Sequence, residues 1–307
     1  MPSSGAARGE SEEFTSTRAQ QVVIEACRAA GLGSDGARLI RLGENALFRL
    51  ERHPIIVRIA RSADYLASAR LEVRVSRWLE AEGFPASRVV EDVEQARVVA
   101  GHPVTFWHLI EENDRKPTYG ELGRVLRDLH ALRPPADLEL PHYDVFGRSG
   151  LRIEKTAGIP SDDREFLRKR SRELHERLAE LRFESPRGPV HGDAHVQNLM
   201  VDRDGQVVLI DFENFSFDYP EWDLMVTATE HDSLSWQTSE QYGDFIGAYG
   251  RDLRDWSGFP TLRAIQEFKM TTWLMQNIGE SAEIADEYAR RIASLRDDSA
   301  PRDWQPG

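Results

Sequence analysis

The 307-residue sequence is poor in cysteine and lysine and has no long apolar segment. Cys27 is its single cysteine, so the chain cannot form an internal disulfide, which fits a reducing cytoplasm. No stretch approaches the roughly 18 apolar residues of a membrane-spanning helix, so no membrane partner is expected. The N-terminus from Met1 to Thr17 is small and polar and lacks the apolar core of a secretory signal. Residues 1–14 are therefore predicted to form a disordered tail.

Lysine is scarce and acidic residues are in excess. The four lysines begin only at Lys116, whereas arginine is abundant. Acidic residues outnumber basic ones by 52 to 39, which gives a formal net charge of −13. A nucleic-acid partner would need a basic patch, so this charge argues against one. The acidity is compatible with a cationic small substrate, and equally with a role in solubility alone.

The first 111 residues have the patterns of a small sheet with a crossing helix. Apolar residues recur at helical spacing in residues 17–30 and 63–82, and Gly83 follows the second helix as a typical terminator. Five short segments have strand character and indicate a mostly antiparallel sheet. These are the segment ending at Leu42, Leu47–Leu50, Ile55–Ala60, Val89–Asp92 and Arg97–Leu109.

The pattern changes near residues 110–113. Helical periodicity covers residues 118–132, 161–183 and most of 220–296. Two apolar runs, Leu199–Val201 and Val207–Ile210, flank the dipeptide Asp204-Gly205, which is typical of a β-hairpin. The sequence therefore predicts an α+β fold with two lobes. Residues 15–111 would form the small antiparallel-sheet lobe, and residues 112–300 the larger, mainly helical lobe.

Three polar residues have the spacing of a phosphoryl-transfer site. Asp193 is followed by Asn198 five positions later, and Asp211 comes thirteen residues after Asn198, at the end of an apolar strand. The predicted hairpin would bring Asn198 and Asp211 to the same end of two adjacent strands. In kinases one Asp contacts the acceptor hydroxyl, while an Asn and a second Asp hold Mg²⁺ against the phosphates. Hard oxygen ligands of this kind suit Mg²⁺.

His191-Gly192-Asp193 with Asn198 and Ile210-Asp211-Phe212 resembles the aminoglycoside phosphotransferase family and its relatives, including the choline and homoserine kinases. The resemblance covers roughly residues 36–295. It implies a bilobal protein-kinase-like fold with the nucleotide between the lobes. Two further segments match patterns that are frequent in the family: Leu122-Gly123-Arg124-Val125-Leu126-Arg127-Asp128-Leu129-His130 and Asp223-Leu224.

The resemblance also implies an activity. The protein would move the γ-phosphate of ATP or GTP to a hydroxyl of a small molecule, such as an aminoglycoside antibiotic, in resistance or self-protection. Asp193 would be the catalytic base, and Asn198 and Asp211 would hold Mg²⁺. Two alternatives stay open: a metabolic kinase for a sugar, amino alcohol or choline-like compound, and a nucleotide-binding pseudokinase. Retention of all three residues speaks against the pseudokinase. A cytoplasmic monomer or homodimer is expected.

The N-terminal lobe departs from the kinase pattern at one position. Arg58 stands where kinases have a lysine on the third strand, and Glu72 on the following helix is its candidate partner. Arginine is always charged and can hold phosphate through forked contacts. A surface Arg58–Glu72 ion pair is the alternative. The other nucleotide-binding candidates, on the loop at residues 43–46, on the third strand and in the hinge segment at residues 106–111, are Gly43, Asn45, Ile56, His108 and Ile110.

Two other kinds of site are alternatives to this interpretation. His191, Asp193 and His195 have the alternating spacing of metal ligands, but a zinc hydrolase would need further ligand histidines nearby. The remaining histidines are scattered, so His191 and His195 are expected to support the loop. The phosphate-binding motif of Walker-type ATPases is absent from the sequence.

The acceptor is expected to bind to the C-terminal helices. These segments are rich in acids and aromatic residues, which suit a sugar or a cationic amine. The candidates are Asp218, Glu230 and Trp273. For most such residues, core packing or solvation remains the simpler interpretation. Asp223 is expected to have a structural role, in which it bonds the loop that carries Asp193.

Overall fold

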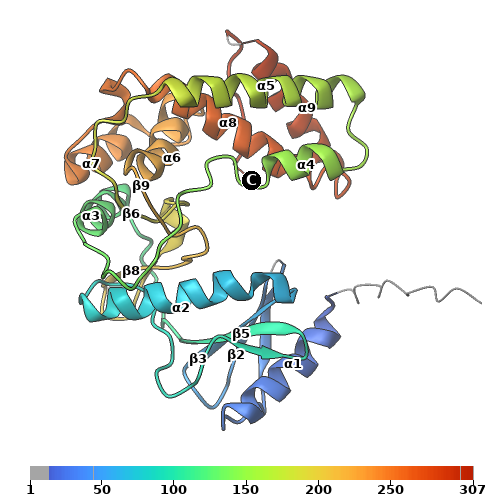
Figure 1. Cartoon of the computed structure of the whole chain (residues 1–307), viewed down its shortest axis with the longest axis vertical. Coiled ribbons are helices and arrows are strands. Elements are labelled where there is room, and N and C mark those ends of the chain that lie inside the picture. The colour runs from blue at the N-terminus through green and yellow to red at the C-terminus, as the bar shows by residue number, and fades with distance from the viewer. Residues whose placement is uncertain (1–13, 44, 298, 307) are drawn as a thin grey trace, which may run out of the picture. The chain divides into compact units, whose positions relative to one another are not determined.

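The computed structural model describes residues 14–43, 45–297 and 299–306. The chain divides into two compact units, Met1–Glu111 and Glu112–Gly307 (Figure 1). Of the tail expected at residues 1–14, only Phe14 lies within the described residues, and its ring packs against His102 with centroids 5.0 Å apart. Over the described ranges, no helix combines the length and apolarity that crossing a bilayer would require.

The first unit is a five-stranded antiparallel sheet with strand order β1-β2-β3-β5-β4. Helix α1 lies on one side of this sheet and helix α2 on the other (Figure 1). A short 3₁₀ turn, η1, leads into α2. The elements are α1 (Ser16–Ala29), β1 (Arg38–Leu42), β2 (Asn45–Arg49), β3 (Ile55–Ala60), η1 (Ala63–Tyr65), α2 (Leu66–Ala81), β4 (Arg97–Val99) and β5 (His102–His108).

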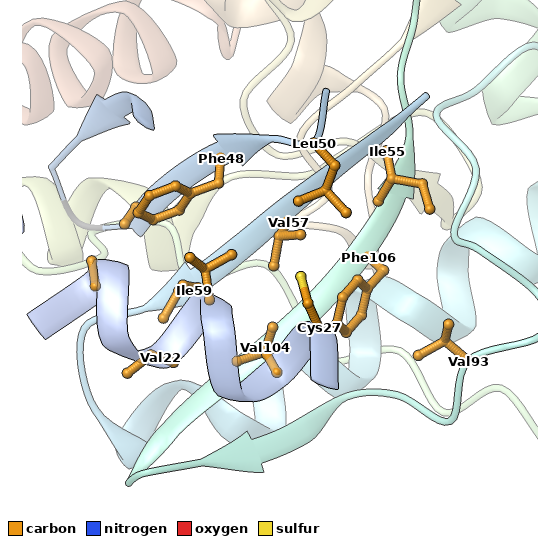
Figure 2. Close-up of a cluster of buried hydrophobic side chains, with 14 of the residues drawn as sticks. Val22, Cys27, Phe48, Leu50, Ile55, Val57, Ile59, Val93, Val104 and Phe106 are labelled. Carbon is orange, nitrogen blue, oxygen red and sulfur yellow. The ribbon is translucent and has the colours of Figure 1, made fainter. Parts of the chain in front are cut away.

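Strand β3 separates an apolar core from a polar face. Its core-facing side chains pack with Val22 and Cys27 of α1, as Figure 2 shows. These buried residues are Ile55, Val57 and Ile59. Burying each such side chain stabilises the fold by roughly 1.5–3 kcal/mol. Ile56 and Arg58 alternate with them and lie half-buried on the opposite face, as the period-two pattern of a strand requires. Arg58 therefore faces α2.

The predicted strand Val89–Asp92 is wrong. Val89 makes only an isolated bridge to Trp107. The side chain of Gln95 occupies the place of the missing ladder: its Nε2 donates to the carbonyl of Val90 at 2.6 Å, and its Oε1 accepts from the amide of Phe106 at 2.7 Å. Because a side-chain amide supplies these bonds, the segment runs beside β5 without pairing regularly with it.

The predicted strand Arg97–Leu109 is two strands. Ala100 and Gly101 have φ angles of +49° and +87° and reverse the chain between Val99 and His102, which pair directly. Positive φ at both central residues is the geometry of a type I′ hairpin turn. The sheet thus has five strands, as expected, but β4 and β5 replace the two strands assigned to these segments.

The second unit is mainly helical and contains two small antiparallel ladders, β6 with β9 and β7 with β8. The ladders and helix α4 are short, and the sequence patterns revealed only β7 and β8. The elements are α3 (Tyr119–His130), α4 (Ser149–Lys155), α5 (Ser161–Glu180), β6 (Gly188–Val190), η2 (Val196–Asn198), β7 (Leu199–Val201), β8 (Val207–Leu209), β9 (Ser216–Asp218), α6 (Glu221–Asp232), α7 (Ser239–Tyr249), η3 (Leu253–Asp255), α8 (Phe259–Met275) and α9 (Ala282–Arg296).

Helix α3 is fixed at its start and along its face. Thr118 and Glu121 form a reciprocal capping box at its N-terminus. Gly123 lets α3 approach α7 closely, since a Cβ at this position would lie 2.4 Å from the carbonyl oxygen of Phe245. His130 at the last turn of α3 is thereby held beside Tyr249 of α7, with ring centroids 5.7 Å apart.

Candidate active site

A buried carboxylate anchors the loop that follows β6. Asp223 on α6 is fully buried. Its Oδ2 accepts from the amide of His191 at 2.8 Å, and its Oδ1 accepts from the amide of Gly192 at 2.7 Å. Charge-assisted bonds of this kind are roughly twice as strong as neutral ones. The structural role expected for Asp223 is confirmed: it fixes the backbone immediately before Asp193.

His130 extends this anchor to two further helices. Its Nε2 lies 2.9 Å from Oδ2 of Asp223, and its Nδ1 lies 3.0 Å from the hydroxyl of Tyr249. A carboxylate can only accept, so Nε2 carries the proton, and Nδ1 accepts from the tyrosine. His130, the last residue of the sequence pattern on α3, therefore donates to Asp223. Tyr249 of α7 donates in turn to His130.

Gly192 allows the sharp turn before Asp193. Its φ angle is +80°, a left-handed conformation that favours glycine. An added Cβ would lie 2.4 Å from the carbonyl oxygen of Asn214. The glycine is thus required both by the backbone conformation and by the close approach of the segment that precedes β9.

His191 ties the loop to the end of β8. The amide of Asp193 donates to Nδ1 of His191 at 3.3 Å, so Nε2 carries the ring proton and donates to the carbonyl of Ile210 at 2.9 Å. The ring is fully buried. The loop-supporting role expected for His191 is therefore confirmed, and the residue it holds at the far end is the neighbour of Asp211.

Asn198 connects Asp193 to the same strand end. Its Nδ2 donates to the backbone carbonyl of Asp193 at 2.8 Å and lies 3.3 Å from Oδ2 of that residue. The carbonyl of Asn198 accepts from the amide of Ile210 at 3.0 Å, in continuation of the β7–β8 hairpin. Asp211 follows with an exposed side chain and a φ angle of +66°. The structure thus brings Asp193, Asn198 and Asp211 together.

The oxygen atoms of Asn198 and Asp211 suit a magnesium ion. Because Nδ2 of Asn198 is committed to Asp193, its Oδ1 is directed elsewhere, and no group among the described residues donates to it. Over the described ranges, no group of three or more His, Cys, Asp or Glu side chains could hold a metal by itself. Mg²⁺ commonly takes one or two protein oxygens together with waters and substrate phosphates. Two hard oxygens at one strand end fit that donor set.

Asp193 is ionised by its surroundings. Desolvation would raise the pKa of its carboxyl, but the hydrogen bond and charge of His195, with the charge of Lys269, hold that pKa below its ordinary value. His195 lies 3.4 Å from Oδ2 of Asp193. Desolvation would lower the pKa of His195, but Asp193 and the charge of Glu230 raise it. The residues around Asp193 therefore favour its carboxylate form, and that carboxylate in turn makes the imidazole of His195 easier to protonate.

Arg58 in the first unit is held by two side chains. Its Nη1 lies 2.5 Å from Oε2 of Glu72, and only 6% of the Glu72 side chain is exposed. With the amide of Asn45 oriented to satisfy both groups, its oxygen accepts from Nη2 and Nε of Arg58 at 2.9 and 3.1 Å. The expected Arg58–Glu72 pair is therefore present, and it is a partly buried contact, not a surface ion pair.

The other nucleotide-binding candidates lie on the same unit. Gly43 is exposed in the turn between β1 and β2, and its neighbour Glu44 lies outside the described residues. Ile56 shares the face of Arg58. The amide of His108 donates to the carbonyl of Arg88 at 2.8 Å, so this backbone donor is already engaged. The hinge role expected for His108 would therefore require its carbonyl or its side chain and not its amide.

The three acceptor candidates have different surroundings. Asp218 is 7% exposed, and its oxygens accept from the amides of Tyr143 and Tyr219 and from Nε1 of Trp222. This geometry argues against a direct contact between Asp218 and an acceptor. Glu230 accepts from Gln237 at 2.7 Å, and burial raises its pKa. Trp273 is 45% exposed on α8.

Two residues near Asp193 were not identified from the sequence. Lys269 on α8 donates a hydrogen bond to the hydroxyl of Tyr143, which is 8% exposed. Desolvation raises the pKa of the Tyr143 phenol, the charge and hydrogen bond of Lys269 oppose that rise, and the charge of Asp193 adds to it. The two residues lie 126 positions apart, so no local pattern could have paired them.

Comparison with known proteins identified one family and several solved structures of similar fold. The chain matches the model of the phosphotransferase enzyme family, APH, over residues 38–301. No curated protein matches it. The amicoumacin kinase hAmiN in complex with AMP-PNP, Ca²⁺ and Ami has a TM-score of 0.71 and 19% identity, over 94% of this chain and 97% of that one. A microcompartment-associated aminopropanol kinase has a TM-score of 0.66 and 22% identity, over 91% and 94%. Spectinomycin phosphotransferase APH(9)-Ia in complex with ADP and spectinomycin has a TM-score of 0.61 and 14% identity, over 92% and 95%.

These similarities extend over nearly the whole chain, so the α+β kinase-like fold predicted from the sequence is confirmed. The family match also spans both compact units and covers the elements from β1 to α9. This protein therefore belongs to the phosphotransferase enzyme family, as the segment around Asp193 predicted.

Proposed function

We propose that this phosphotransferase moves the γ-phosphate of ATP or GTP to a hydroxyl group of a small molecule. The observation that carries the proposal is the arrangement of Asp193, Asn198 and Asp211 around one loop and one strand end. A non-catalytic nucleotide-binding protein would have no need of this arrangement. The solved relatives support a nucleotide donor, because one contains AMP-PNP and another contains ADP.

In the proposed reaction the acceptor oxygen forms a bond to the γ-phosphorus. The bond from that phosphorus to the β–γ bridging oxygen breaks, and the nucleoside diphosphate leaves. Asp193 orients the attacking hydroxyl and receives its proton. Asn198 Oδ1 and the Asp211 carboxylate would hold Mg²⁺, which when bound neutralises the charge of the phosphate oxygens. The chain's contribution is mainly to position reactants and stabilise charge.

Arg58 is proposed to contact the donor phosphates. The supporting observation is that Glu72 and Asn45 fix its guanidinium from two sides. A guanidinium held in one orientation presents a rigid fork of donors, which matches the geometry of phosphate oxygens. Gly43, Ile56 and the hinge residues His108 and Ile110 remain proposed nucleotide contacts.

The proposed acceptor is small and hydroxylated. The relatives include kinases of an antibiotic and of aminopropanol, so an antibiotic such as an aminoglycoside and a metabolic alcohol are both candidates. Glu230 and Trp273 remain proposed acceptor contacts, since Glu230 acts electrostatically on His195 beside Asp193 and Trp273 is exposed. Asp218 is proposed to position Tyr143 and Trp222 instead.

The experiment that tests this function is a phosphate-transfer screen. ATP and GTP, each labelled at the γ-phosphate, are incubated with antibiotics, sugars, amino alcohols and hydroxy acids, and labelled products are separated by mass. Asp193→Ala should abolish transfer while nucleotide affinity, measured by calorimetry, stays within a few-fold of the wild type. Asn198→Ala and Asp211→Asn should lower the affinity for the magnesium–nucleotide complex as well as the rate.

Asp204→Ala is the matched control, because Asp204 is an exposed carboxylate in the turn at the other end of the β7–β8 hairpin. It should behave like the wild type in both assays. Equal turnover in Asp193→Ala would contradict the role proposed for this residue. Tight nucleotide binding with no transfer to any acceptor would instead favour the pseudokinase.

A further inference from the structure

Lys269 presents a positive charge that no carboxylate of the described residues pairs with. Its ammonium donates to the Tyr143 hydroxyl and lies 4.8 Å from the centre of the Tyr143 ring. No ion pair forms between Lys269 and any described acid, although the sequence contains 52 acidic residues. The side chain is half-buried. Charged groups removed from water are normally paired, because desolvation without a partner is costly.

The pair has unused hydrogen-bond donors on both of its members. An ammonium has three N–H groups, and only one is used by Tyr143. The Tyr143 oxygen accepts that bond, and its own proton has no acceptor among the described residues. Two donors side by side match the two oxygens of a carboxylate, and the charge of Lys269 repels a cationic amine.

Two contacts of Tyr143 place this pair against the strand ladder and the helix that support the loop of Asp193. The amide of Tyr143 donates to Asp218 at the end of β9, which pairs with β6, and β6 leads directly into His191. The Tyr143 ring also contacts the ring of Trp222, with centroids 5.5 Å apart. Trp222 immediately precedes the anchor Asp223. The electrostatic effect of Lys269 on Asp193 agrees with this location.

The neighbouring surface of α8 is suited to a small polar molecule with an apolar part. Trp273 lies one helical turn beyond Lys269 and is 45% exposed. Gln276 follows on the same side, and its Oε1 accepts from Nε of Arg152 at 3.3 Å. The charge of Lys269 beside this surface would repel a polycationic acceptor.

We propose that Lys269 and Tyr143 form an anion-recognition subsite of the acceptor site, and that the acceptor is a small hydroxylated molecule bearing a carboxylate. The inference rests on the proposed function, since only a transferase has an acceptor. The carboxylate binds to the ammonium and the phenol, and the hydroxyl of the same molecule is thereby presented to Asp193. A hydroxy acid is then a better acceptor than an aminoglycoside.

The first test measures binding without turnover. The chain has four lysines, so protein labelled with ¹³C and ¹⁵N only at lysine gives four side-chain signals by NMR, and Lys269→Arg assigns one of them. Glycerate, glycerol and aminopropanediol, which share a three-carbon skeleton and differ in charge, are added in turn. Glycerate should shift the Lys269 signal, while the signals of Lys116, Lys155 and Lys169 stay in place.

Three results of this titration would overturn the proposal. The first is a shift of the Lys269 signal with aminopropanediol and not with glycerate. The second is no shift with glycerate up to the limit of its solubility. The third is a shift with magnesium and AMP-PNP alone and none with glycerate, which would assign Lys269 to the transferred phosphate.

The second test measures specificity. In the wild type, kcat/KM should be higher for glycerate than for glycerol. Lys269→Met should reduce this preference, the kcat/KM for glycerate divided by that for glycerol, about tenfold through the KM for glycerate. A tenfold loss is expected for one charged contact worth about 1.4 kcal/mol. Tyr143→Phe should reduce it less, and the surface variant Lys169→Met should not change it, because Lys169 pairs with Glu173 on α5. A drop in kcat that is equal for all acceptors contradicts the proposal. Absence of transfer to every acceptor contradicts the proposed function, and the NMR titration still decides the subsite.

Discussion

Asp223 anchors the loop that carries Asp193, so we expect a large effect from a very small change, Asp223→Asn. The asparagine has the size of the aspartate, so the effect comes from the lost charge and the changed hydrogen bonds and not from packing. Oδ2 accepts from both His191 and His130, whereas Oδ1 accepts only from Gly192. The amide nitrogen will therefore replace Oδ1, because this position costs one acceptor and not two.

The magnitude follows from these three bonds. The buried amide of Gly192 loses its acceptor, which costs about 1–3 kcal/mol. The bonds from His191 and His130 change from charge-assisted to neutral, at about 1 kcal/mol each. The sum, about 3–5 kcal/mol, is large compared with the total stability of an ordinary domain, about 5–15 kcal/mol. The same change releases the backbone before Asp193, so kcat should fall more than the affinity for nucleotide.

Urea unfolding followed by tryptophan fluorescence measures the first effect, and phosphate transfer to the best acceptor of the screen measures the second. Asp128→Asn is the control, since Asp128 is an exposed residue of α3 that pairs with its neighbour Arg127. The control should lie within about 0.5 kcal/mol of the wild type. An Asp223→Asn protein that unfolds at the wild-type urea concentration, with wild-type kcat, would refute the reasoning.

Three further predictions concern other parts of the chain. Gly192→Ala should abolish transfer and lower the urea midpoint, because its Cβ would meet the carbonyl of Asn214 and its φ is left-handed. Arg58→Ala should raise the KM for ATP by a hundredfold or more, the loss of about 3 kcal/mol that a charged contact can contribute, and Arg58→Lys should recover part of it. Asp252→Asn should cost about 1–3 kcal/mol at pH 7, because the carboxylate accepts from Tyr242 and Arg254. Desolvation would raise the pKa of Asp252, but these bonds hold that pKa below its ordinary value, so the stabilisation is present above the unfolded pKa and disappears as the pH falls through the folded one.

Each of these has a direct check. Wild-type transfer by Gly192→Ala would mean that the loop tolerates a side chain. An unchanged KM for ATP in Arg58→Ala would remove Arg58 from the phosphate contacts. For Asp252, urea unfolding is followed from pH 7 down to about pH 3, and a difference between wild type and variant that stays constant over this range would contradict the assignment.

The sequence predicted the parts of the fold that depend on local periodicity. The alternation of β3 correctly separated the core positions Ile55, Val57 and Ile59 from the face of Arg58. The spacing of the three polar residues from Asp193 to Asp211 indicated one site because the hairpin between them is short and its turn signal is strong. These features need only neighbouring residues, so a single sequence contains them.

The remainder depended on contacts between distant residues. The side chain of Gln95 takes up backbone groups through which the predicted strand Val89–Asp92 would have paired with β5. Nothing in the sequence of residues 89–92 indicates this. The burial of Asp218 likewise follows from Tyr143 and Trp222 around it, so an acid that seemed available to an acceptor has its oxygens engaged. A cytoplasmic location and a monomeric or dimeric state remain predictions from the sequence.

The electrostatics of Asp193 narrow what its role can be. A general base works best when its pKa lies near the working pH, yet the surroundings of Asp193 lower its pKa from an already acidic value. Such a carboxylate removes a proton poorly from an unreacted hydroxyl. In a loose phosphoryl-transfer transition state the hydroxyl becomes acidic only as its bond to phosphorus forms. Under the proposed mechanism Asp193 therefore acts first by orienting the hydroxyl and receives the proton late. That order explains why the backbone around it is fixed by Asp223 and His191: the position of the carboxylate matters more than its basicity.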